Sequence, residues 1–137
     1  MVNITLVKKL LSDLREKKNI LQQKKIKNFD EFKSDPFLHN AIQHILEVMI
    51  EIMVDIGNHI ISDNEWGTPS SNREIFEILE QHGVISSDMA KLTNKMIGFR
   101  NIIVHMYEKV DLEEVYVIYK RNLKDFEKFA SEVEKYL

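Results

Sequence analysis

The sequence predicts an all-α fold, an antiparallel up-and-down four-helix bundle with one extra short helix, and three observations support this fold class. Glycine occurs 4 times and proline 2 times, too rarely for the many turns of a sandwich, a barrel or a doubly wound sheet. Apolar residues recur at steps of three and four, and no stretch carries a strand signal. A length of 137 residues suits a single domain, expected over 1–137.

The first helix is expected over about residues 3–27. Leu10, Leu14 and Leu21 recur at helical spacing, and lysines occupy the other side. A polar stretch, 28–35, with two embedded phenylalanines separates this helix from the next. The second helix is expected over about 36–62, because Pro36 suits a first helical position and Asp35 suits an N-cap.

The second helix carries one narrow polar stripe along an otherwise apolar surface. The members of the stripe are spaced three or four residues apart: Asn40, His44, Glu47, Glu51, Asp55 and Asn58. The apolar residues cover far more than the roughly 100° arc that packing against one core requires. We therefore expect this helix to be buried on two sides. A small bundle offers few partners for the second side, which predicts a homodimer contact.

Three further helices are expected after a loop over 62–70 that contains Trp66. Ser71 and Glu74 have capping-box spacing for a short third helix, and a glycine at position 83 suits its end. Ser86 or Ser87 can cap a fourth helix. Asp111 and Glu114 repeat the box before a last helix that reaches residue 137.

Composition excludes several classes of protein. Hydrophobic residues make up 44% and charged residues 30%, which suits a soluble globular domain. The absence of cysteine excludes disulfides, thiolate metal sites and a cysteine nucleophile. The N-terminus lacks the pattern of a signal peptide, and the most apolar stretch, 41–61, is interrupted by Glu47, Glu51 and Asp55. We expect a cytoplasmic protein that does not contact a membrane.

The charge is distributed unevenly along the chain. The net charge is −3, but residues 1–28 hold eight lysines or arginines against two acids, a net +6 that leaves −9 for the rest. Lysines at this end can hold an RNA backbone, or they can form an ordinary solvated helix face. The candidate RNA-holding residues are Lys8, Lys9, Lys17, Lys18, Lys24 and Lys25.

Three polar residues stand out of the apolar end of the fourth helix: Arg100, His105 and Tyr107. At 100° per residue, Arg100 and Tyr107 would lie about 20° apart on one face of a regular helix. His105 would point about 140° away from Arg100. The two come together only if the helix frays near Val104 or if a second subunit completes the site.

This trio suits cleavage of an RNA phosphodiester. A histidine can move the proton of the 2′-hydroxyl or of the leaving 5′-oxygen, and an arginine can bind the phosphate oxygens as their negative charge grows. The 2′-hydroxyl is an internal nucleophile, so the reaction requires neither a metal nor a cofactor. The alternative is structural: Arg100 pairs with a carboxylate of the stripe, His105 stabilises the helix end, and Tyr107 lies at the edge of the core.

The string RNIIVHMY at 100–107 resembles the signature of the HepT-like HEPN-domain proteins, toxins that are paired with minimal nucleotidyltransferase antitoxins in type VII systems. Phe99 before the string, Val110 and Asp111 after it, and the segment 73–85 are also similar to this family. The resemblance covers most of the chain from Pro36 onward.

The resemblance implies a dimeric helical bundle whose two motifs face one cleft and which cleaves RNA without a metal. Arg100 and His105 correspond to the catalytic pair, and Asn101 matches a polar residue that often follows the arginine. Tyr107 corresponds to the residue that the nucleotidyltransferase antitoxin modifies with AMP from ATP, which silences the toxin. Asp55 and Glu51 are the candidates for an assisting acid. The alternative function is a non-catalytic module that binds a nucleotide or docks the nucleotidyltransferase.

Overall fold

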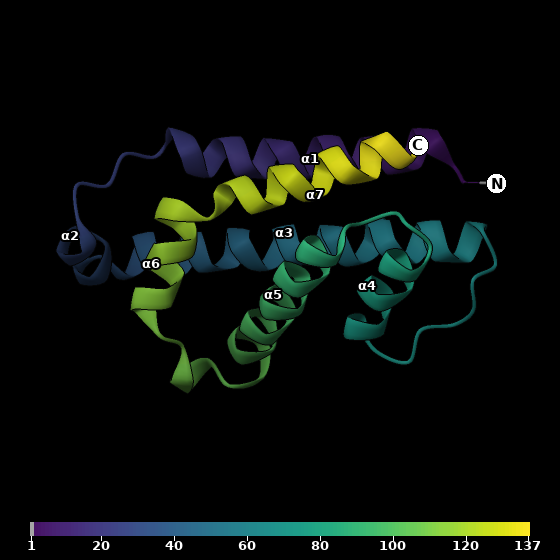
Figure 1. Ribbon diagram of the computed structural model, residues 1–137. Helices are drawn as coiled ribbons and strands as arrows, with labels where there is room; N and C mark the ends of the chain where they lie inside the picture. The colour runs from purple at the N-terminus through teal and green to yellow at the C-terminus, as the bar shows by residue number, and fades with distance from the viewer. Residues whose placement is uncertain (1) are drawn as a thin grey trace.

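The computed structural model describes residues 2–137, and all of the regular elements in that range are helices, which confirms the predicted fold class (Figure 1). The predicted domain, 1–137, is thus described from its second residue; Met1 lies outside the described residues. The helices are α1 (Ile4–Gln23), α2 (Phe29–Ser34), α3 (Pro36–Asp63), α4 (Asn72–Gln81), α5 (Ser87–His105), a single 3-10 turn η1 (Tyr107–Lys109), α6 (Leu112–Arg121) and α7 (Leu123–Tyr136).

Helix starts follow the predicted capping residues. The Asp35 carboxylate accepts a hydrogen bond from the Leu38 amide, and the Ser71 and Ser86 hydroxyls accept from amides three residues on. These bonds satisfy amides that the first turn of a helix leaves without partners. Gly83 ends α4 with a φ of 75°, a conformation that suits glycine. Local sequence therefore determines where these helices begin and end.

Two predicted elements differ from the structure. The stretch 28–35 contains the short helix α2, because the Asn28 side chain accepts from the Glu31 amide and Phe32 is fully buried. The expected single last helix is two, α6 and α7, which change direction at Asn122. The break lets α6 pack against α2 and α3 while α7 lies along α1 (Figure 1). The first helix is also shorter than predicted and ends at Gln23.

The central helix α3 is covered on both of its apolar sides along most of its length within one chain, although Phe37 near its start is 89% exposed. It contacts α1 on one side and α4, α5 and α6 elsewhere (Figure 1). Leu46, Met49 and Met53 are completely buried. Our argument that α3 needs a second subunit to cover it was therefore wrong, because the short helices supply the missing partners. A dimer requires other support.

Ion pairs join α1 to α7 and neutralise part of the basic first helix. The Arg15 guanidinium donates to Glu127 at 3.0 Å and to Glu134 at 2.7 Å, and Lys18 donates to Glu127 at 3.3 Å. Burial alone would raise the pKa of Glu127, but hydrogen bonds from Arg15 and Lys18 lower it; the hydrogen bond from Arg15 lowers the pKa of Glu134. Lys18 therefore holds the fold together and is not a free RNA ligand.

No helix within residues 2–137 is both long enough and apolar enough to cross a membrane.

Candidate functional site

The candidate site lies at the C-terminal end of α5, where the sequence weakens the helix. Ile102, Ile103 and Val104 are β-branched residues with reduced helix propensity. The helix nevertheless remains regular through His105, and Met106 then leaves it with φ −136° and ψ 46°. Fraying near Val104, one of the two alternatives that the sequence left open, does not occur.

Tyr107 does not share a helix face with Arg100, so that prediction was wrong. Tyr107 begins the 3-10 turn η1, two residues beyond the end of α5 at His105. The turn is closed by hydrogen bonds from the Lys109 amide to the Met106 carbonyl and from the Val110 amide to the Tyr107 carbonyl. The Tyr107 ring is 74% exposed. The tyrosine is thus presented to solvent and is not a core-edge residue.

Arg100 reaches the polar stripe of α3. Its Nη2 donates a hydrogen bond to Glu51 Oε1 at 3.3 Å, and its side chain is 19% exposed. Its Nε is buried and has no acceptor among the residues that the structure describes. A buried donor without an acceptor costs about 1–3 kcal/mol. Arg100 is therefore held in place by Glu51, and its guanidinium forms no other hydrogen bond within the described residues.

His105 is exposed and lies five residues beyond Arg100 on the same regular helix. A rotation of 100° per residue separates the two side-chain directions by about 140°. A single chain therefore does not aim both groups at one point. Of the two ways in which the pair could converge, only completion by a second subunit remains.

The supporting residues are positioned unequally. Glu51 contacts Arg100 directly. Asp55 lies one turn further along α3 and is exposed, and Asn101 is exposed beside Arg100 on α5. Neither of these two forms a hydrogen bond to Arg100 within the described chain. The structure thus favours Glu51 over Asp55 as the acid that assists Arg100.

Apolar side chains surround the motif at the surface. Val104 is 37% exposed and Met106 is 45% exposed, next to Tyr107. A cluster of exposed apolar residues at one end of a helix is typical of a contact surface.

Residues 2–137 contain no group of three or more potential metal ligands.

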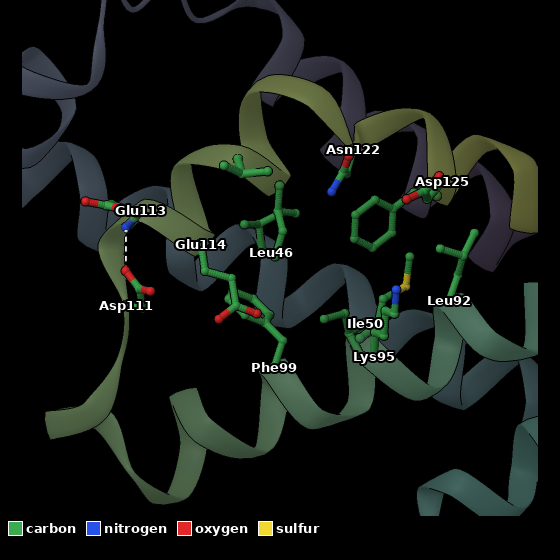
Figure 2. Close-up of a pocket in the computed structure, with 14 residues that line it drawn as sticks. Leu46, Ile50, Leu92, Lys95, Phe99, Asp111, Glu113, Glu114, Asn122 and Asp125 are labelled. Atoms are coloured by element: carbon green, nitrogen blue, oxygen red, sulfur yellow. Dashed lines mark hydrogen bonds between the residues drawn. The ribbon is translucent and has the colours of Figure 1, made fainter.

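A cavity of about 370 Å³ lies nearby, between α3, α5, α6 and α7 (Figure 2). Its walls are mainly apolar and include Leu46, Ile50 and Phe99, but the acidic residues Asp111, Glu113, Glu114 and Asp125 also line it. Arg100 and His105 do not line it. The acidic side chains would repel phosphate groups, so this cavity is not suited to hold RNA.

The sequence analysis missed one basic surface. Lys120, Arg121 and Lys124 line a depression together with Lys24 and Lys25 from the end of the first helix. The only sequence signal was the short basic string KRNLK at 120–124, which is unremarkable by itself.

Comparison with known proteins places these features in one family. The sequence model described as "Ribonuclease HepT-like" matches residues 6–133. The chain is 35% identical over 99 residues to the mRNA nuclease HepT of Shewanella oneidensis, which covers 72% of this chain and 74% of that protein. It is 25% identical over 117 residues to the tRNA nuclease HepT of Aphanizomenon flos-aquae, covering 82% and 80% of the two chains.

Solved structures agree with the sequence comparison. A tri-AMPylated HEPN toxin of Shewanella oneidensis in complex with its MNT antitoxin matches with a TM-score of 0.87 and 29% identity, covering 98% of this chain and 99% of that one. The YutE protein of Bacillus subtilis matches with a TM-score of 0.84 at 22% identity and supports the fold.

Proposed function

Because the chain belongs to the ribonuclease HepT-like family, we propose that it is an endoribonuclease, the toxin of a toxin–antitoxin pair, and that it acts in the cytoplasm on RNA without a metal. The observation that carries the proposal is the arrangement of Arg100, His105 and Tyr107 at the exposed end of α5, with Arg100 held by Glu51 and its Nε unpartnered. The catalytic pair is Arg100 and His105.

The proposed reaction needs only the groups of the motif and the RNA itself. Neutral His105 takes the proton of a 2′-hydroxyl, the 2′-oxygen forms a bond to phosphorus, and the bond to the 5′-oxygen breaks. The leaving 5′-oxygen takes a proton from water, so the products are a 2′,3′-cyclic phosphate and a 5′-hydroxyl. Arg100 binds the non-bridging oxygens, whose charge increases at the transition state. Glu51 orients the guanidinium, with Asp55 as the second candidate for the assisting acid, and the exposed Asn101 is a secondary candidate for contact with RNA.

The site is completed by a second copy of the chain. His105 points about 140° away from Arg100 on one helix, so the nearest available partner for Arg100 is the His105 of another subunit. The exposed Val104 and Met106 supply apolar contact area beside both residues. We expect a homodimer in which the two α5 ends face one cleft.

RNA cleavage in the presence of EDTA tests the proposal. Wild-type protein should release products with 2′,3′-cyclic phosphate ends, and His105→Ala should be slower by about 10²–10⁴. Arg100→Ala should be inactive as well, whereas Asn101→Ala should retain more activity. If His105→Ala cleaves at the wild-type rate, the catalytic assignment is wrong. If the wild type binds RNA or its partner but leaves the RNA intact, the protein is a binding module.

Tyr107 is the proposed site of control by a nucleotidyltransferase partner. Its oxygen would attack the α-phosphorus of ATP, so that an O–P bond forms, pyrophosphate leaves and the phenolic proton passes to solvent. Exposure of 74% gives a transferase access to the ring. The attached AMP adds bulk and negative charge next to the catalytic pair, and both oppose RNA binding.

Tyr107→Phe separates modification from cleavage. With the transferase and ATP, wild-type toxin should gain one AMP mass at Tyr107 and lose activity. The phenylalanine variant should stay unmodified there and stay active, because the proposed reaction does not use the hydroxyl. Silencing of the variant to the same extent would place the control elsewhere.

A further inference from the structure

The depression at the junction of α6 and α7 is lined by five cations from two segments that are far apart in the sequence, 24–25 and 120–124. Lys24 and Lys25 follow α1, Lys120 and Arg121 end α6, and Lys124 lies in the first turn of α7. The depression has a volume of about 360 Å³, and no carboxylate is among its lining residues. All five side chains are exposed.

These five cations do not join helices through ion pairs, in contrast to Arg15 and Lys18. Arg15 and Lys18 pair with carboxylates of α7. None of the five cations of the depression forms an ion pair in the part of the chain that the structure describes. Five unneutralised positive charges around one hollow repel each other, so a bound anion relieves the repulsion.

The backbone around the depression is held firmly. The hydroxyl of Tyr119 donates a hydrogen bond to the carbonyl of Lys24, which fixes the end of α1 against α6. The N-cap of α7, Asn122, provides no side-chain hydrogen bond to the first amides of that helix. Leu123 and Lys124, at the start of α7, line the hollow, and the start of a helix favours negative charge.

We infer that this depression binds the phosphate backbone of a single-stranded RNA substrate outside the cleavage site. The inference rests on the proposed ribonuclease function and adds a second contact region to it. Tyr119 is 6% exposed, so the depression offers no open aromatic face for stacking bases. Contacts to phosphate alone raise affinity without selecting sequence.

The helix α6 sets the distance between the two regions. It begins at Leu112, five residues after Tyr107, and ends at Arg121, which lines the depression. Ten residues at a rise of 1.5 Å span about 15 Å. A stacked strand at about 3.4 Å per nucleotide needs four to five nucleotides to cover that length. A dinucleotide is therefore too short to span α6 from the motif to the depression.

A charge-neutral variant tests the inference: Lys120→Gln/Arg121→Gln/Lys124→Gln. The control is Lys33→Gln/Lys128→Gln/Lys135→Gln, which removes the same charge from exposed lysines that do not line the depression. For a 15-nucleotide RNA we expect KM to rise on the order of 10- to 100-fold at 0.1 M salt, and the slope of log affinity against log salt to fall by about 2. The kcat value and the cleavage of a dinucleotide should match the control.

Equilibrium binding of RNA to His105→Ala proteins, with and without the substitutions in the depression, separates this inference from the proposed ribonuclease function. If the wild type does not cleave RNA, the proposed ribonuclease function is wrong, but RNA binding by the His105→Ala proteins still tests the depression. Because Lys120 and Arg121 also stabilise the end of α6, thermal melting accompanies the assay, and Lys24→Gln/Lys25→Gln, outside any helix, gives an independent variant. RNA affinity and salt slope equal to the control would overturn the inference. Unchanged RNA binding together with a loss of binding to the nucleotidyltransferase would also overturn the inference.

Discussion

Mixed dimers offer the sharpest test of a site shared between subunits. Arg100→Ala and His105→Ala are each expected to be inactive. If each site takes Arg100 from one chain and His105 from the other, a mixed dimer of the two variants has one site that lacks both groups and one site that is intact. The 140° separation along a regular helix is the reason to expect this arrangement.

The magnitude follows from counting sites. A purified mixed dimer, selected through two different affinity tags, should have about half of the wild-type activity, and an equimolar exchange mixture about one quarter. The matched control pairs wild-type chain with the double variant Arg100→Ala/His105→Ala, and this mixed dimer should be inactive because every site lacks one group. The assay is release of a labelled RNA fragment after subunit exchange.

The reverse pattern would refute the reasoning. If the wild-type/double-variant dimer keeps half of the activity while the dimer of single variants has none, both groups act from the same chain. The α5 end would then have to rearrange on RNA binding, and the α5 geometry described here would not be the active one.

Two further predictions concern the fold. Hydrogen bonds from Arg15 lower the pKa of Glu134, so the stability that they give is present above the ordinary carboxyl range and is lost as the pH falls through the pKa of the folded state. Arg15→Met should therefore lower Tm at pH 7 and flatten the decline of Tm below about pH 5. An unchanged dependence of Tm on pH would contradict this. A Cβ at Gly57 would lie 2.4 Å from Ile75 Cγ2, so Gly57→Ala should destabilise the fold by about 1–3 kcal/mol in urea unfolding. In Gly98→Ala the new Cβ would meet only the end of a flexible side chain at 3.3 Å, so this variant should be neutral or stabilised by up to about 1 kcal/mol. Equal losses of unfolding free energy in both variants would show that steric crowding at Gly57 is not the cause.

Local sequence was sufficient wherever a residue acts on its own neighbours. Asp35, Ser71 and Ser86 cap helices through bonds that span three residues, and apolar periodicity placed α3, α4 and α5. The motif residues themselves were also readable, because their types and spacing lie within eight positions of the chain. Such features depend on backbone geometry that is the same in any fold.

Other features depended on packing between distant segments. The periodicity of the last 25 residues continues through Asn122, so only the need to pack α6 on α3 and α7 on α1 reveals the break. Because short helices cover α3 within one chain, the apolar surface of α3 is no longer an argument for a dimer. The position of Tyr107 likewise depended on where α5 stops.

The sequence by itself determined the helical class and most helix boundaries, and it pointed to Arg100, His105 and Tyr107 as the proposed chemical groups. Only the tertiary structure decided that Glu51, and not Asp55, holds Arg100, and that Lys24 and Lys120 border one depression. The physical reason is range: helix periodicity and capping act over a few residues, whereas these contacts join positions 49 to 96 residues apart and exist only once the helices have packed.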